Sequence, residues 1–150
     1  MIIFKRTQSD QADFVYLVSL LDADLRERDG EEHSFYAQFN KTDAIKNVIV
    51  CYDGDKPVGC GAFKKYDDQK TEIKRMYVLP EMRAKGTGHA ILKELEQWAA
   101  ELNYTHCLLE TGKKQPEAIR LYQKAGYGFI ENYGQYKGVE NSVCMMKEIA

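Results

Sequence analysis

The sequence predicts a mixed α/β domain in which helices pack on a central sheet. Short apolar stretches alternate with amphipathic segments along the chain, in the order β, α, α, β, β, β, α, β, α, β, β. The 150 residues fit one domain spanning 1–150, because no repeat or Pro- or Ser-rich linker marks a boundary. With 44% hydrophobic and 29% charged residues, the composition excludes disordered and collagen-like classes.

The first third of the chain is predicted to hold one strand and two helices. Residues 2–4 (Ile-Ile-Phe) form the strand, and Ser9 or Asp10 can cap a helix over about 11–28. The apolar side of that helix consists of Phe14, Leu17, Val18 and Leu21. Residues 33–47 form a second, less regular helical segment.

Three strands are predicted next. Residues 48–52 and 57–63 flank Asp53-Gly54-Asp55-Lys56, where the Asp-Gly pair supplies the positive φ angles of a tight hairpin turn. Residues 71–79 form a further strand that ends at Pro80.

The second half of the chain contains the clearest helix, over residues 89–102. Its apolar stripe consists of Ile91, Leu92, Leu95, Trp98, Ala99 and Leu102. Residues 107–109 form a short buried strand, after which Pro116 begins another helix and Gly126 ends it. Strands over 127–131 and 142–148 surround a Gly/Tyr-rich loop.

Charge and hydropathy limit the partners that we expect. The 21 Lys and Arg against 23 Asp and Glu give a net charge of −2, which argues against a nucleic-acid binder. No apolar run approaches the roughly 18 residues of a membrane span. The N-terminus becomes polar too soon for a signal peptide. We therefore expect a cytoplasmic protein without a nucleic-acid or membrane partner.

The residues that could bind a metal are scattered. No two of Cys51, Cys60, Cys107 and Cys144 form a CxxC pair, and apolar stretches surround three of them. Buried reduced thiols explain this pattern better than disulfides or zinc. The three histidines are equally dispersed, so we predict no metal site.

Residues 22–32 hold the sharpest charge asymmetry, with six acidic and two basic residues. The segment is either a solvated helix end or an acidic lip that attracts a cationic substrate.

Residues 83–88 read Arg-Ala-Lys-Gly-Thr-Gly and lie directly between a strand and a helix. Gly86 and Gly88 allow a tight turn that brings backbone N–H groups together at the positive end of the helix dipole. Arg83 and Lys85 add positive charge, so a phosphate or pyrophosphate is the expected guest. An ordinary loop before a helix is the alternative. The segment lacks the Gly-Lys-Ser/Thr of a Walker loop and the complete GxGxxG of a dinucleotide fingerprint.

Two motifs resemble the GNAT family of N-acetyltransferases. Val78-Leu79-Pro80-x-x-Arg83-x-x-Gly86-x-Gly88 is similar to its acyl-CoA-binding signature, and residues 118–127 (AIRLYQKAGY) are similar to its second motif. The resemblance covers essentially the whole chain. It implies the GNAT fold, a mixed, mostly antiparallel twisted sheet splayed around the acyl-CoA site with helices on both faces.

The resemblance implies acetyl-CoA as the co-substrate and direct transfer to a primary amine. Residues 76–78 would splay from residues 108–111 and pair with the pantetheine arm, and an N–H near Val78 would polarise the thioester carbonyl. Gln115 stands where the family often has Asn. The expected donor contacts are Met76, Tyr77, Val78, Arg83, Ala84, Lys85, Gly86, Thr87, Gly88, His89, Thr111, Gln115 and Tyr122.

Two side chains are candidates for acid–base catalysis. Tyr122 falls at the family's general-acid position, and a phenol is protonated at neutral pH. Glu72 is the best base candidate, because its position eleven residues before Arg83 resembles that of the glutamate base in histone-acetylating members of the family. It also shares a strand face with Met76 and Val78. A structural tyrosine and a solvent-facing carboxylate are the competing interpretations. Glu110 or a water chain could also serve as the base.

The acceptor site is predicted from position and composition. Tyr133 and Tyr136 occupy the loop that lines the acceptor pocket in this family, and His33, Tyr36 and the acidic segment would form the opposite wall. A small-molecule amine is the expected acceptor. The alternatives are a lysine or N-terminal amine of a protein, and a non-catalytic acyl-CoA sensor. Because dimers are common in the family, we also expect a homodimer.

Overall fold

The computed structural model describes residues 1–29 and 44–149. Its centre is a seven-stranded sheet in the order β1-β2-β3-β4-β5-β7-β6. The strands are β1 (Ile2–Thr7), β2 (Asn47–Asp53), β3 (Lys56–Lys65), β4 (Lys70–Val78), β5 (His106–Gly112), β6 (Gly128–Ile130) and β7 (Ser142–Glu148). Neighbouring strands are antiparallel except β4 and β5, which are parallel. The predicted mixed, mostly antiparallel sheet is confirmed.

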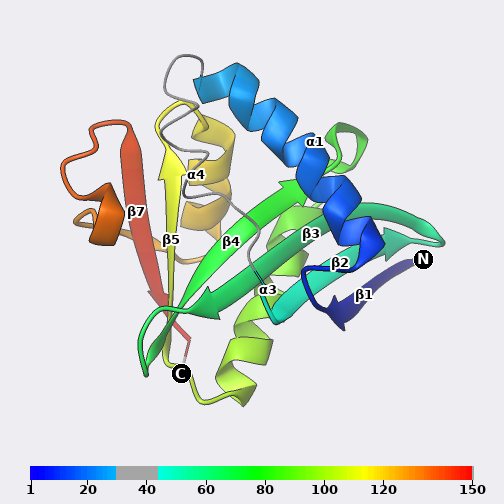
Figure 1. Ribbon diagram of the computed structural model, residues 1–150, viewed down its shortest axis with the longest axis horizontal. Coiled ribbons are helices and arrows are strands. Elements are labelled where there is room, and N and C mark those ends of the chain that lie inside the picture. Colours follow the sequence, from blue (N-terminus) through cyan, green and yellow to red (C-terminus); the bar gives the residue numbers. More distant parts are fainter. Residues whose placement is uncertain (30–43, 150) are drawn as a thin grey trace.

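Three described α-helices cover the two faces of the sheet (Figure 1). Helix α1 (Ala12–Asp29) crosses one face over β2–β4 and buries Phe14 and Leu17 there. On the opposite face, α3 (Thr87–Glu101) packs against β2–β4, and α4 (Pro116–Lys124) lies beside α3 and β5. The apolar stripe of α3 accounts for this placement, because Ile91, Leu92 and Leu95 are fully buried. The prediction of helices on both faces is confirmed.

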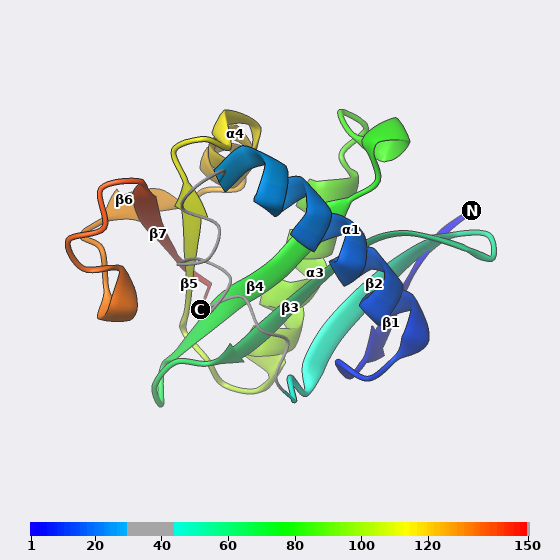
Figure 2. The same cartoon turned by 45° about the horizontal axis from the view of Figure 1, so that its top comes forward.

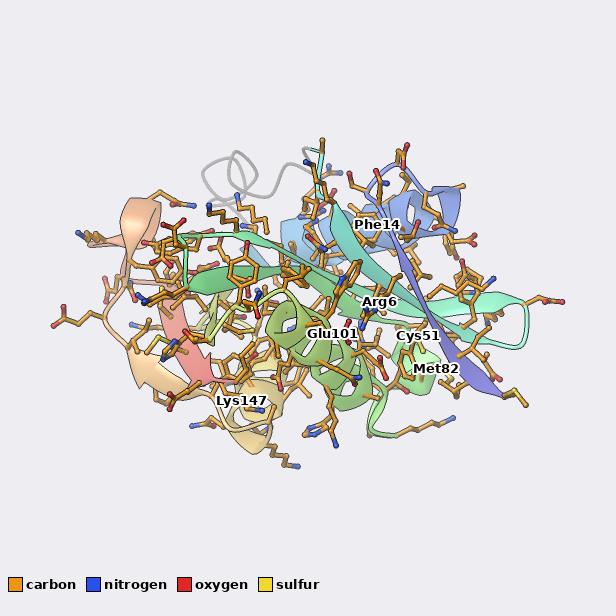
Figure 3. The ribbon with its side chains drawn as sticks, turned by 90° about the horizontal axis from the view of Figure 1, so that it is seen from below. Arg6, Phe14, Cys51, Met82, Glu101 and Lys147 are labelled. Carbon is orange, nitrogen blue, oxygen red and sulfur yellow. The ribbon has the colours of Figure 1, made fainter. Side chains whose placement is uncertain are left out.

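A salt bridge ties the N-terminal edge of the sheet to the end of α3. Two guanidinium nitrogens of Arg6 each donate to a carboxylate oxygen of Glu101 over 2.8 Å, and Figure 3 shows both side chains. The four cysteines lie inside the domain as buried free thiols, as the apolar surroundings predict. None of the described helices is both long and apolar enough to cross a membrane.

Several element ends differ from the prediction. The first strand continues to Thr7, because Phe4–Thr7 pairs with β2. The predicted helix over 33–47 is wrong at its end, since Asn47 begins β2, and its part over 33–43 lies outside the described residues. Gln11, and not Ser9 or Asp10 as predicted, caps α1: its Oε1 accepts from Phe14 N over 2.9 Å. Ser9 Oγ accepts from Ile45 N instead.

Candidate active site

The parallel strands β4 and β5 pair over only a short stretch. Lys70, Thr71 and Glu72 lie opposite residues 106–108, and the register stops there. Beyond this point the strands diverge towards α4, as Figure 2 shows. Residues 76–78 therefore have an edge that β5 does not cover, which matches the splay expected from the family resemblance.

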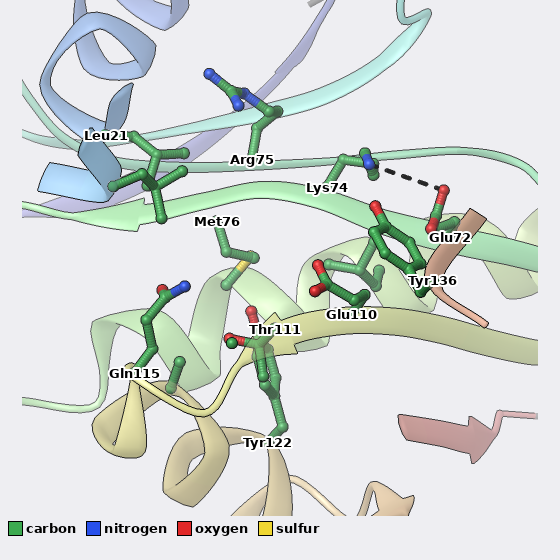
Figure 4. A pocket seen from close by; sticks show the side chains of 14 residues that line it. Leu21, Glu72, Lys74, Arg75, Met76, Glu110, Thr111, Gln115, Tyr122 and Tyr136 are labelled. Atoms are coloured by element: carbon green, nitrogen blue, oxygen red, sulfur yellow. Dashed lines mark ion pairs between the residues drawn. The ribbon is translucent and has the colours of Figure 1, made fainter. Parts of the chain in front are cut away.

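Two adjoining cavities occupy the split between the strands. The larger cavity, of about 600 Å³, lies at the open end between α1, β4, α3 and α4. The smaller cavity, of about 110 Å³, lies nearer the paired ends of β4 and β5, and Figure 4 shows its lining side chains. The residues that line both are Leu21, Met76, Gln115, Ala118 and Tyr122.

The loop before α3 presents backbone donors to the larger cavity. Gly86 is the N-cap of α3 with a φ of 83°, and no side chain caps the helix there. The first N–H groups of α3 thus remain available to an anion, which the helix dipole also favours. Gly88 permits close packing of the helices, since a Cβ there would stand 3.2 Å from Leu121 Cδ2 of α4.

Arg83 lies across the uncovered end of β4. Its Nε donates to the Val78 carbonyl oxygen over 2.8 Å, and its guanidinium stands 5.4 Å from the centre of the Tyr77 ring. The predicted donor contacts that line the larger cavity are Met76, Tyr77, Val78, Arg83, Ala84, Gly86, Thr87, Gly88, His89, Gln115 and Tyr122. Thr111 lines the smaller cavity instead, and Lys85 lines neither.

A β-bulge interrupts β4 next to these cavities. Gly61 of β3 faces both Arg75 and Met76, and Arg75 has a φ of 59°, which is strained for a residue with a Cβ. A Cβ at Gly61 would clash with Met76 Sδ and with Ile91 and Leu95 of α3, so Met76 faces α3. The prediction that Glu72 and Met76 share one regular strand face is therefore wrong, because the bulge breaks the period-two alternation (Figure 4).

Tyr122 of α4 points into the space between the strands (Figure 4). Its side chain is buried, and burial followed by the nearby charge of Glu110 raises its pKa above the ordinary value for a phenol. The hydroxyl therefore keeps its proton at neutral pH and can donate it. The ring is held edge-on against Tyr127, with 5.9 Å between the ring centres.

Glu72 and Glu110 both line the smaller cavity, from β4 and β5 respectively. The Glu72 side chain is only 5% exposed, and its Oε1 lies 4.0 Å from Lys74 Nζ. Burial is the main cause that lowers the pKa of Lys74, and the charge of Glu72 opposes it. No motif in the sequence marks Lys74 as a site residue, although its period-two spacing from Glu72 places both side chains on one strand face.

The two tyrosines predicted for the acceptor wall take different places. Tyr136, in the single turn Gly134–Tyr136 before β7, lines the smaller cavity with 1% of its surface exposed. Tyr133 lines neither cavity and donates its hydroxyl to Glu72 Oε2 over 2.7 Å. The other predicted wall residues, His33 and Tyr36, lie outside the described residues.

Two acidic residues of the segment 22–32, Asp22 and Asp24, take part in ion pairs. Asp22 Oδ1 accepts from Arg75 Nη2 over 2.5 Å, and Asp24 pairs with Arg28. Arg28 also pairs with Glu117 at the start of α4, which joins α1 to α4 beside the larger cavity. Asp22 thus takes part in an ion pair with β4, whereas Asp24 pairs within α1 and also lines the larger cavity. The acidic lip stays a prediction.

Comparison with known proteins identifies the family. The family model described as "Acetyltransferase (GNAT) family" matches residues 14–127, which is more than half of the chain. The uncharacterized N-acetyltransferase YsnE of Bacillus subtilis (strain 168) is 32% identical over 100 residues, covering 65% of this chain and 66% of that protein. The chain thus matches less than two thirds of that relative's length.

Solved structures share the fold over the whole chain. A structure described as an acyl-CoA N-acyltransferase of Klebsiella pneumoniae subsp. pneumoniae MGH 78578 aligns with a TM-score of 0.83 and 26% identity, covering 100% of this chain and 99% of that one. A GNAT family acetyltransferase of Elizabethkingia anophelis with acetyl-CoA bound aligns with a TM-score of 0.71 and 17% identity, covering 98% and 97%. Together, the family-model match, the split sheet and these structures show that the chain belongs to the acetyltransferase (GNAT) family.

Proposed function

We propose that the protein transfers the acetyl group of acetyl-CoA directly to a primary amine of a small molecule. The observation that carries this proposal is the pair of connected cavities in the split sheet. One end offers uncapped helix N–H groups, the middle offers an uncovered strand edge, and the protonated phenol of Tyr122 borders both cavities. An extended acyl-CoA molecule needs these three features in this order.

The donor would lie along the larger cavity. The backbone N–H groups between Arg83 and His89, together with the Arg83 and Lys85 side chains, would hold the pyrophosphate. The edge over Met76–Val78 would pair with the pantetheine arm, with Thr111 and Gln115 near the thioester. The Val78 carbonyl oxygen already accepts from Arg83 Nε, and its second lone pair can accept from the pantetheine arm.

The thioester of acetyl-CoA supplies the activated acyl group, and the protein's own groups manage charge and protons. A backbone N–H near Val78 would stabilise negative charge on the carbonyl oxygen. Tyr122 would protonate the departing sulfur, and Glu72 would accept the proton from the amine, directly or through water. Glu110 is the second candidate for the base because it lines the same cavity.

The cysteines support direct transfer without a cysteine-bound acetyl group. Burial raises the pKa of Cys60 to about 12 and those of Cys51 and Cys144 to about 11. Burial likewise raises the pKa of Cys107. Because the thiolate is the nucleophilic form, protonated buried thiols are poor acceptors of an acyl group.

The size of the smaller cavity favours a small acceptor. Its 110 Å³ equals the space of several water molecules, and buried side chains enclose it on the β4 and β5 sides. A free amine fits such a pocket, whereas a protein acceptor would need an open groove for the chain around its lysine or N-terminus. Acetylation of a protein or peptide, and acyl-CoA sensing without turnover, are the alternatives that an experiment must separate.

Thermal unfolding with acetyl-CoA, followed by assays of CoA release, separates these functions. We expect acetyl-CoA to raise the unfolding temperature, because it binds only the folded protein. Turnover of free amines supports the proposal, whereas turnover of peptides alone would favour a protein substrate. Stabilisation without any turnover would indicate a sensor, and no stabilisation would contradict the donor site. Sedimentation of the same protein tests the expected homodimer.

A further inference from the structure

One hydrogen bond joins β4 to the connection between β6 and β7, at the end of the sheet where β4 and β5 are still paired. Tyr133 lies in the connection between β6 and β7, and Glu72 lies in β4, on the other side of the β4–β5 junction. The Tyr133 hydroxyl donates to Glu72 Oε2 over 2.7 Å. Burial, followed by the charge of Glu72, raises the pKa of Tyr133, so the phenol stays protonated and remains the donor.

The surrounding structure fixes the position of the Tyr133 ring. Tyr66, at the end of β3, and Tyr136 both meet it edge-on, with 5.2 and 5.8 Å between ring centres. Asn132 Nδ2 donates to the carbonyl oxygens of Val139 and Ser142 over 3.1 Å, which closes the loop that carries Tyr133. These ring contacts and loop hydrogen bonds position the hydroxyl that donates to Glu72.

We propose that Tyr133 is a positioning residue that fixes the Glu72 carboxylate through Oε2 and leaves its other oxygen beside the smaller cavity. This inference rests on the proposed function and on Glu72 as the base. Because the Glu72 side chain is only 5% exposed, protein groups rather than water fix the direction of its carboxylate, and Tyr133 supplies the hydrogen bond on Oε2. With Oε2 bonded to Tyr133, Oε1 is the oxygen that can accept the acceptor's proton, since Lys74 Nζ stands 4.0 Å from it, beyond hydrogen-bond distance.

The other ionisable groups near Glu72 belong to every element packed around it. They are Lys64 of β3, Lys74 of β4, Glu110 of β5, Tyr136 before β7 and Cys144 of β7. Replacing Tyr133 by Phe keeps all of these groups and the ring, and removes only the hydroxyl.

The test compares the pH dependence of kcat/KM in four variants. In Tyr133→Phe we expect the acidic limb of the profile to move to higher pH by about one unit, because the variant lacks the 2.7 Å hydrogen bond on Glu72 Oε2. The matched control is Tyr127→Phe, which removes the same kind of contact, a 2.9 Å bond from a tyrosine hydroxyl to buried Glu96 behind the sheet. Its acidic limb should not move.

Glu72→Gln and the double variant Glu72→Gln with Tyr133→Phe complete a double-mutant cycle with the unaltered protein and Tyr133→Phe. If Tyr133 acts through Glu72, the second substitution changes nothing further in the Glu72→Gln background. An unmoved limb in Tyr133→Phe, or an equal loss in both backgrounds, would overturn the positioning role. Tyr66→Leu gives a second test, because it loosens the ring without touching Glu72, and it should move the limb in the same direction by less.

The outcomes also distinguish a failure of the positioning role of Tyr133 from a failure of the proposed function or of Glu72 as the base. Absence of acetyl transfer in the unaltered protein would contradict the proposed function. Transfer whose pH profile is unchanged in Glu72→Gln would remove Glu72 as the base. A profile that depends on Glu72 but not on Tyr133 would overturn the positioning role alone.

Discussion

Three tyrosines keep their protons for the same physical reason, and their hydroxyl groups have different partners. Burial raises the pKa of Tyr122, Tyr127 and Tyr133 above the ordinary phenol value. Tyr127 and Tyr133 each donate to a buried glutamate, whereas Tyr122 borders the two cavities. The sequence contains ten tyrosines, and their spacing predicts none of these partners. The motif around Tyr122 indicates its place in catalysis, while the loop position of Tyr133 indicates only the acceptor wall.

Replacing Tyr122 by Phe tests the proposed general acid. We expect kcat to fall roughly 100-fold, because the leaving sulfur loses its proton donor, while the Kd for acetyl-CoA changes far less. Since the raised pKa keeps the phenol protonated, the unaltered enzyme should lose no kcat to Tyr122 ionisation between neutral pH and about pH 9.

Steady-state kinetics and calorimetric titration with acetyl-CoA measure the two constants for Tyr122→Phe. Tyr104→Phe is the control, because Tyr104 packs against Phe63 and lines neither cavity. Equal losses of kcat and affinity in Tyr122→Phe would make Tyr122 a packing residue.

At the scale of elements, the loop before α3 carries the donor-binding prediction. Gly86 has a φ of 83°, and a Cβ added there would have no atom within 4 Å, so alanine introduces backbone strain without a clash. We expect Gly86→Ala to destabilise the fold by about 1 kcal/mol and to weaken acetyl-CoA binding, since the strained loop no longer holds its N–H groups in place.

Gly54 in the β2–β3 turn is a matched control for Gly86. It has a φ of 63° and equally open surroundings, but it is remote from both cavities. Gly54→Ala should lose a similar amount of stability, measured by urea unfolding, and keep its affinity for acetyl-CoA. Equal affinity losses in the two variants would show that the loop at Gly86 does not hold the donor.

The periodicity of apolar residues and the turn residues predict most strands and helices of the described chain, because each apolar stripe is the side of its element that packs into the core. Two features could not be predicted from the sequence, because they depend on contacts between distant segments. The β4 bulge exists where Gly61 allows two residues of β4 to oppose one of β3. The capping of α1 differs because Ser9 bonds Ile45, which lies far along the chain. Element ends are set by such long-range partners, which local patterns do not reveal.

For the whole molecule, the split between β4 and β5 creates the site but also removes the pairing of these strands beyond Glu72. Side-chain contacts with the helices must therefore help to hold the split part of β4 in place. Arg75 is the buried end of one such contact, with 1% of its side chain exposed, and its Nη2 bonds Asp22 of α1. We expect Asp22→Asn to destabilise the protein by about 1–3 kcal/mol, because a buried guanidinium then lacks its countercharge.

Urea unfolding of Asp22→Asn against Asp68→Asn measures this effect. Asp68 pairs with Lys65, but its side chain is 96% exposed, so the loss of that ion pair should change stability by less than about 0.5 kcal/mol. Equal stabilities of the two variants would contradict a structural role for the Arg75–Asp22 pair.

Direct transfer of the acetyl group from acetyl-CoA to an amine, in the split between β4 and β5, is the step that the proposed function depends on. The most direct measurement is the yield of free CoA and of acetylated amine in one reaction, with the intact mass of the protein recorded alongside. We expect both products to form in a one-to-one ratio only when both substrates are present, and we expect acetyl-CoA alone to leave the protein mass unchanged. Free CoA together with a covalently acetylated protein in the absence of amine would contradict direct transfer.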